Sequence, residues 1–93
     1  MTPDIVHDAA QSRFVAHVEG QTCVLDYDLE GDTMTITHIG VPDPVGGRGI
    51  AAALTRAALE TARARGWRVV PQCGYAARYV REHAEWSDLV AHG

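Results

Sequence analysis

Two features of the sequence predict a small α+β domain with a mostly antiparallel sheet and two helices. The first half of the chain alternates apolar and polar residues between turn signals, which is typical of an antiparallel meander. The second half contains a long alanine-rich pattern at helical spacing, then a short strand signal and a second short helix. The predicted order is therefore β-β-β-α-β-α. We expect residues 1–93 to form one domain, with an ordered core over about 13–90.

The composition indicates a domain that folds around its own hydrophobic core. Hydrophobic residues make up 46% of the 93 residues, so neither a disulfide nor a metal ion is needed for stability. Cys23 and Cys73 are the only cysteines and no Cys/His cluster accompanies them, so we expect no metal site and two free thiols.

The charge and the apolar runs limit the partners and the location of the protein. The formal net charge of −4 argues against non-specific nucleic-acid binding. No apolar run approaches the ~20 residues of a membrane span, and the N-terminus lacks the pattern of a signal peptide. We therefore expect a cytoplasmic protein with neither a nucleic-acid nor a membrane partner, and the sequence does not predict an oligomeric state.

The first half of the chain is predicted to form a three-stranded meander. Residues 1–11 are polar, and we expect them to be frayed. From Arg13 onward apolar and polar residues alternate, and Phe14, Ala16 and Val18 share one face. The predicted strands cover residues 13–19, 22–27 and 33–41, with a tight turn at Gly20-Gln21 and a second turn over Asp28–Asp32.

The third predicted strand changes phase in its middle. Met34 and Ile36 mark one face, whereas Ile39 and Val41 mark the other, and His38 lies at the change. A β-bulge at this point accounts for the pattern, and bulges are frequent next to active sites. A strand that is buried on both faces accounts for it equally well.

The second half of the chain is predicted to be mainly helical. Residues 49–65 place apolar side chains at helical spacing, and Gly66 is a typical C-terminal stop. Tyr75 and Tyr79 are four residues apart and share one face of the second helix. The remaining elements are a strand over 67–72, that second helix over 75–83, and a closing segment in which Trp86, Leu89 and Val90 cover the core.

A glycine-dense segment, Gly46-Gly47-Arg48-Gly49-Ile50-Ala51, comes directly before the long helix. Glycine allows close approach to a ligand, and unpaired N–H groups at a helix N-terminus favour a phosphate or pyrophosphate. The nucleoside-triphosphate loop requires a lysine, and the chain has none. The dinucleotide fingerprint requires a parallel first strand and an acidic residue about 20 positions later. Here the glycine segment follows an antiparallel meander, and residues 69–72, where the acid is expected, contain none.

The segment resembles motif A of the GNAT N-acetyltransferases, above all in the short single-domain members of that superfamily. The resemblance covers roughly residues 13–90, and its strength lies in the order and spacing of several motifs. The motifs are His38-Ile39-Gly40-Val41-Pro42, Gly46 through Ala51 followed by Leu54, Pro71-x-Cys73-x-Tyr75-x-x-x-Tyr79-Val80, and His83-Ala84-Glu85-Trp86-x-Asp88-Leu89-Val90.

The resemblance implies a GNAT-like (acyl-CoA N-acyltransferase) fold that binds acetyl-coenzyme A. In the family, N–H groups of the loop hold the pyrophosphate, and the pantetheine arm pairs with the preceding strand. The implied coenzyme-binding residues are Ile39, Val41, Gly46, Gly47, Arg48, Gly49, Ile50 and Ala51. The chain departs from the family at Gly46, where arginine or glutamine is usual, and Arg48 is the cation nearest in sequence that can replace the missing contact.

The implied catalytic residues are His38, Cys73 and Tyr79. The imidazole of His38 suits a general base, and Cys73 at a helix N-terminus suits a leaving-group acid or an acyl-accepting nucleophile. Tyr79 is a second candidate acid. Each has a structural alternative: a satisfied sheet histidine, a small buried hydrophobe and a core aromatic residue.

The predicted activity is acetyl transfer from acetyl-coenzyme A to a primary amine of a small molecule or protein. A coenzyme A-binding module with little or no turnover is the main alternative, and a protein-interaction domain with a vestigial loop is the third. The sequence does not identify the acceptor.

Overall fold

The computed structural model describes residues 4–91 and contains one five-stranded sheet with strand order β1-β2-β3-β4-β5. All neighbouring strands are antiparallel except β4 and β5, which are parallel. The predicted α+β class is therefore confirmed. The strands are β1 (Ile5–Asp8), β2 (Arg13–Val18), β3 (Gln21–Glu30), β4 (Thr33–Gly40) and β5 (Arg68–Pro71), the α-helices are α1 (Ile50–Arg65) and α2 (Gly74–Glu82), and the 3-10 turns are η1 (Ala9–Gln11), η2 (Asp43–Val45) and η3 (Ala84–Leu89).

The structure corrects the expectation that residues 1–11 are frayed. Ile5–Asp8 form β1, which pairs with β2 and adds one strand to the predicted order; residues 1–3 lie outside the described part of the chain. His7 faces the buried side, where its ring stacks on Phe14 at a centroid distance of 4.2 Å. Its Nε2 also lies 2.7 Å from the hydroxyl of Tyr27. The alternation of β1 was missed because a histidine occupies an inward position of a very short strand.

The two hairpin turns differ slightly from the prediction. The β2–β3 turn is Glu19-Gly20, one residue earlier than expected, and both residues have positive φ, of 48° and 78°. This pattern is typical of a two-residue type I′ turn. The turn predicted over Asp28–Asp32 is too long, because β3 continues to Glu30 and only Gly31-Asp32 form the turn. Residues 28–32 at the end of this hairpin are all exposed, so their mainly polar sequence resembles that of a loop.

The phase change in the third predicted strand is a β-bulge in β4. Asp26 pairs with His38 and Tyr27 pairs with Ile36, which leaves Thr37 as the extra residue on β4. The bulge interpretation is confirmed, and the alternative of a strand buried on both faces is wrong because Thr37 and His38 are exposed. Beyond the bulge Ile39 pairs with the buried Leu25 and so returns to the core side.

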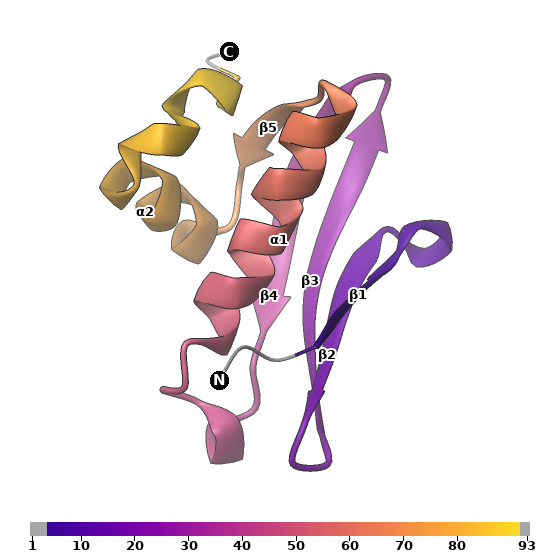
Figure 1. Ribbon diagram of the computed structural model, residues 1–93, viewed down its shortest axis with the longest axis vertical. Coiled ribbons are helices and arrows are strands. Elements are labelled where there is room, and N and C mark those ends of the chain that lie inside the picture. The colour runs from indigo at the N-terminus through magenta and orange to yellow at the C-terminus, as the bar shows by residue number, and fades with distance from the viewer. Residues whose placement is uncertain (1–3, 92–93) are drawn as a thin grey trace.

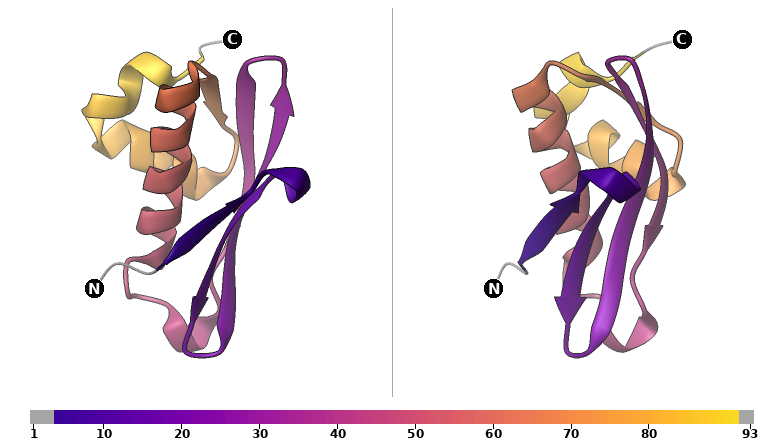
Figure 2. Two further views of the ribbon diagram at one scale, coloured as in Figure 1. Left: turned by 45° about the vertical axis from the view of Figure 1, so that its right-hand side comes forward. Right: turned by 90° about the vertical axis from the view of Figure 1, so that its right-hand side faces the viewer.

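The helices lie on one side of the sheet (Figures 1 and 2). α1 crosses that side and buries Ile50, Leu54, Ala58, Leu59 and Ala62 against the strands. Gly66 ends α1 with φ of 71°, and its N–H bonds to Ala62 and Arg63 carbonyls. The predicted helices and β5 are confirmed to within one residue at each end, and Trp86 and Leu89 of η3 are buried as expected.

The opposite side of the sheet, here called the outer face, carries the side chains that alternate with the buried ones. Val15, Val24, Asp26 and Thr35 lie on this outer face and are half-buried. None of the helices formed by residues 4–91 packs on it, as the edge-on view in Figure 2 shows. The sheet therefore presents one face to its own core and the other to its surroundings.

β4 and β5 separate after a short shared ladder. Their last pair is Ile36 with Pro71, and the N–H of Cys73 then bonds to the carbonyl of Ile36 at 3.0 Å. Pro71 has no N–H and marks the end of the ladder. Within the described chain, Thr37–Gly40 continue β4 with no strand on their β5 side. We call this opening, bounded by β4 after Ile36 and by the β5–α2 connection, the β4–β5 split.

The histidine of β1 predicts an acid-sensitive stability. Burial lowers the pKa of His7 from its ordinary value of 6.5, Arg65 lowers it further, and Asp8 opposes the shift. The unfolded chain therefore binds the proton more readily, so the contribution is complete above pH 6.5 and decreases as the pH falls toward the lower folded pKa. We expect the urea-derived free energy of unfolding to drop between about pH 7.5 and about pH 5.5.

His7→Gln should make this drop smaller, because the substituted side chain cannot titrate. His17→Gln is the matched control, since His17 is an exposed histidine on the neighbouring strand. An equal drop in His7→Gln and in the unsubstituted protein would contradict the assignment.

Candidate active site

The loop between η2 and α1 presents the backbone geometry that the predicted anion site requires. Gly47 and Gly49 have φ of 78° and 76°, a region that favours glycine. Gly49 is the N-cap of α1 and no side chain caps the helix. The N–H of Ala53 donates to the carbonyl of Gly49 at 3.0 Å, and this is the first hydrogen bond of the helix. The N–H groups of the turn before Ala53 therefore have no acceptor within the helix. No acidic residue lies in this turn, which leaves the positive end of α1 available to an anion.

Gly46 differs from the other two loop glycines. Its φ of −64° and ψ of 156° are open to any residue, and a Cβ here would lie 3.3 Å from the Asp43 carbonyl. The φ and ψ values therefore do not require glycine at the position where the resembled motif usually has arginine or glutamine, although a Cβ would make a tight contact with this backbone oxygen.

The cation of the loop is already paired. Arg48 Nη1 forms an ion pair with Glu19 Oε2 at the tip of the β2–β3 hairpin. Glu19 reaches it from a backbone conformation with φ of 48°, which is uncommon for glutamate. Both side chains are about half exposed, so the pair adds little to stability. It does orient the guanidinium toward a carboxylate at the edge of the loop.

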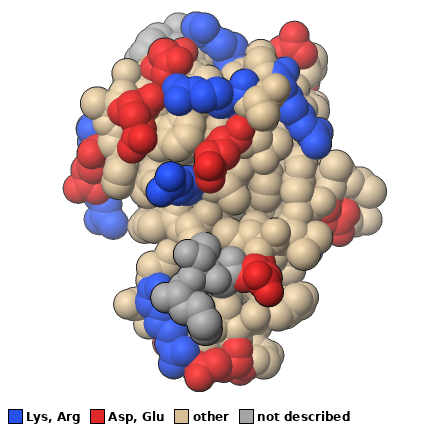
Figure 3. Space-filling model, viewed as in Figure 1, with Lys and Arg blue, Asp and Glu red and all other residues tan. Residues whose placement is uncertain are grey.

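Among residues 4–91, three further ion pairs lie on the helical side, and all are exposed. Arg63 of α1 pairs with Asp88 of η3 at 2.6 Å. Arg56 pairs with Glu60 at 3.6 Å, and Arg78 pairs with Glu82 at 3.9 Å, each one helical turn apart. Figure 3 shows basic and acidic side chains intermixed over the helices. None of these pairs involves the glycine loop, where the available donors are backbone N–H groups and the Arg48 side chain.

Cys73 and His38 border the β4–β5 split from opposite sides of the sheet. Cys73 is the N-cap of α2, is partly buried against the core, and accepts a bond from Ala77 N at 2.9 Å through its carbonyl. His38 lies on the outer face opposite Asp26 and is exposed. Its Nε2 lies 3.0 Å from the point where a Cβ at Gly40 would be, so the ring covers that glycine. The structure thus brings both residues to the split without placing them on the same face.

Ile39 and Val41 follow the bulge and pack partly against the core. They lie at and just after the end of β4, where the strand continues past the split toward the glycine loop. The chain therefore connects the split directly to the glycine loop.

Tyr79 lies away from the split. It projects from α2 toward α1, where with Ala53 and Arg56 it lines a hollow of about 430 Å³. Its ring stacks on His83 at 4.0 Å. Burial raises the pKa of its hydroxyl, and Arg56 partly opposes the shift. The structure does not group Tyr79 with Cys73 and His38.

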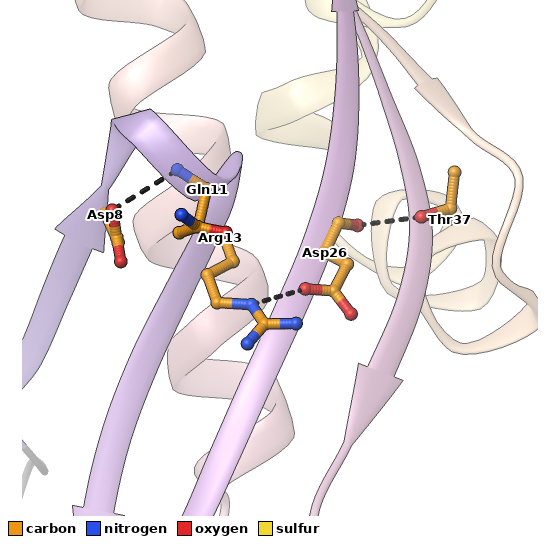
Figure 4. A network of polar contacts seen from close by, with 5 residues as sticks. All are labelled: Asp8, Gln11, Arg13, Asp26 and Thr37. Atoms are coloured by element: carbon orange, nitrogen blue, oxygen red, sulfur yellow. Dashed lines mark hydrogen bonds and ion pairs between the residues drawn. The ribbon is translucent and has the colours of Figure 1, made fainter.

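Sequence reasoning missed a polar network on the outer face (Figure 4). Arg13 Nε bonds to Asp26 Oδ1 at 2.9 Å, and the hydroxyl of Thr37 donates to the Asp26 carbonyl at 3.2 Å. The available signal was a carboxylate between Leu25 and Tyr27, within a run, 23–27, that is otherwise apolar. Its meaning depends on strand register, which the sequence pattern does not fix.

Residues 4–91 contain neither a cluster of metal-ligating side chains nor a helix that could span a membrane. Within these residues no group of three or more His, Cys, Asp or Glu side chains gathers as a metal site. None of the helices in this part of the chain is long and apolar enough to cross a membrane.

The structure is an α+β protein in which a glycine loop at a helix N-terminus follows the strand that borders a split in the sheet. The sequence model of the family described as GCN5-related N-acetyl-transferase matches residues 13–89, and the chain belongs to this family. The chain is also similar in structure to a GCN5-like protein from Staphylococcus aureus, solved by NMR and presented as a candidate N-acetyltransferase. The TM-score is 0.77 at 20% identity, covering 99% of this chain and 91% of that chain, which confirms the GNAT-like fold. No curated protein matches the chain.

The loop geometry predicts opposite outcomes for two glycine substitutions. Gly49→Ala forces an alanine into positive φ and should destabilise the protein by ~1 kcal/mol. Gly46→Ala keeps an allowed conformation and should change stability by less than ~0.5 kcal/mol. Urea unfolding of the two variants tests this difference, and equal losses in both would contradict it.

Proposed function

We propose that the protein is an acetyl-coenzyme A-dependent N-acetyltransferase that acts on a primary amine of a small molecule or protein. Membership of the GCN5-related family supports the reaction class. The observation that carries the coenzyme assignment is the glycine loop, where two positive-φ glycines precede an uncapped, acid-free helix N-terminus. In this proposal residues 1–93 act as one domain, and the two free thiols, Cys23 and Cys73, agree with the reducing cytoplasm.

Two features of the described residues support binding of the coenzyme, the glycine loop and the free edge of β4. In the proposal, N–H groups of Gly47, Arg48, Gly49, Ile50 and Ala51 bind the pyrophosphate. Gly46 is the exception among the predicted loop residues, because its N–H already bonds to the Asp43 carbonyl at 3.0 Å. The pantetheine amides pair with the backbone of Ile39 and Val41, where β4 has no neighbouring strand on its β5 side among residues 4–91. The bound thioester supplies an activated acetyl group, and this arrangement brings it to the β4–β5 split.

The two residues at the split have complementary roles in the proposal. His38 accepts a proton from the amine on the outer face, where it is exposed to solvent that can take the proton onward. Cys73 donates a proton to the departing sulfur from the N-terminus of α2. Tyr79 is the second candidate for this donation, but its side chain lines the hollow beside α1.

A coenzyme A-binding module with little turnover is the second candidate function. Gly46 lacks the side chain that the family usually places on the phosphates, and Arg48 is paired with Glu19. Calorimetric titration with coenzyme A tests both functions, since both require binding. Release of free coenzyme A in the presence of an amine then separates the enzyme from the binding module.

Restoring the family side chain should strengthen coenzyme binding. Gly46→Arg adds a guanidinium at a position whose backbone accepts it, and we expect about tenfold tighter binding of coenzyme A by calorimetry. Gly46→Ala is the matched control and should bind like the unsubstituted protein. No gain in Gly46→Arg would mean that the phosphates do not lie at this loop position.

Removing the thiol at the split should affect turnover and leave binding intact. Cys73→Ala is expected to lower acetyl transfer by about tenfold to a hundredfold while the coenzyme affinity stays within about twofold. Cys23→Ala is the control, because Cys23 is buried in the sheet. Unchanged turnover in Cys73→Ala would remove the thiol from the mechanism.

A further inference from the structure

A row of ionisable side chains crosses the outer face and ends at the split. Asp8, Arg13, Asp26 and His38 are successive Cα partners on β1, β2, β3 and β4. Cross-strand partners in an antiparallel pair share a face and lie within reach of one another. The charged row therefore leads across the sheet to the residue that borders the β4–β5 split.

Asp26 occupies the central position of this row. Its Oδ1 accepts the 2.9 Å bond from Arg13, and its main-chain carbonyl is held by Thr37 at the bulge. The Asp26 side chain is 28% exposed, and its Oδ2 has no hydrogen-bond partner among the described residues (Figure 4). A carboxylate thus stands beside His38 with one oxygen available to a ligand.

An apolar row runs parallel to the charged one. Val6, Val15, Val24 and Gly40 are likewise successive Cα partners on the outer face. Val6 is 63% exposed, and the His38 ring lies over Gly40. Val24 and Asp26 are two positions apart on one strand, which separates them by about 6.6 Å. This distance suits a ligand with a short alkyl chain and a cationic end.

We propose that the acceptor is an alkyl amine of the lysine type, which reaches the split over the outer face with its methylenes on Val24 and its ammonium on Asp26. The inference rests on the proposed acetyltransferase function and names its substrate class. A carboxylate next to apolar side chains complements an alkylammonium ion in both charge and shape. An anionic or purely aromatic acceptor would gain nothing from this arrangement.

The placement gives a balanced transfer. The ammonium held by Asp26 loses one proton to His38, which releases it to solvent. The neutral nitrogen bonds the acetyl carbon as the carbon–sulfur bond breaks, and the electrons of that bond leave on sulfur. Cys73 protonates the departing thiolate and regains its proton from the acylated nitrogen, so that one acetyl group is exchanged for one hydrogen.

Two substitutions of opposite sign test the role of Asp26. With n-butylamine as acceptor, Asp26→Asn should raise KM about tenfold with a small change in kcat. Arg13→Gln frees the carboxylate from its competing cation and should lower KM for n-butylamine about twofold to threefold. If the Arg13–Asp26 pair only stabilised the sheet, both substitutions would change KM in the same direction, which would overturn the proposal. Aniline, which is neutral at pH 7, is the control acceptor, and its KM should not respond to Asp26→Asn.

A binding measurement separates this inference from the coenzyme assignment. Titration of ¹⁵N-labelled protein with n-butylammonium chloride, without coenzyme, should shift the amide signals of Val24, Asp26 and His38, and Asp26→Asn should abolish these shifts. Such shifts without any coenzyme A binding would retain the amine site and reject the proposed function. Coenzyme A binding with no shift at these three amides would reject the amine site alone.

Discussion

The extra residue Thr37 in β4 is the constraint on which the site depends. Before the bulge, Met34 and Ile36 face the core, and after it Ile39 faces the core again, although the sequence spacing between them is odd. His38 can therefore lie on the outer face without disrupting the buried face of the strand. A bulge also bends and twists its strand, which agrees with the separation of β4 from β5 after Ile36. One inserted residue thus accounts for the packing of β4, the exposure of His38 and the position of the split.

The two halves of the site differ in what holds them. The half proposed to bind the coenzyme phosphates depends on main-chain conformation, because the donors it offers are N–H groups and its two positive-φ glycines fix where they point. The half at the split depends on side chains whose positions follow from strand register. Ion pairs contribute orientation rather than stability in both halves, since Arg48 with Glu19 and Arg13 with Asp26 are partly exposed.

Periodicity predicted most of the fold because the buried positions of the strands and helices repeat regularly. It failed at β1, where four residues are too few to show a period and His7 faces inward. It located the glycine loop and Cys73, since both are local patterns next to a helix start. It could not find Asp26 as a neighbour of His38, because these residues lie on adjacent strands and their pairing depends on the one-residue register shift at Thr37. Nor could it place Tyr79, whose environment is set by how α2 packs on α1.

The short ladder between β4 and β5 has a consequence for dynamics. β5 is four residues long, and the chain reaches it only after the whole of α1, whereas the meander strands are joined by tight turns. Its pairing is therefore the non-local part of the sheet and closes the larger loop. The segment from β5 through η3 is expected to open at a lower free energy than the meander, and amide exchange there should be faster. Cys73 lies in this segment, and its N–H bonds to the carbonyl of Ile36 in β4. Opening of the segment would therefore break this bond and widen the split while the glycine loop and the meander stay folded.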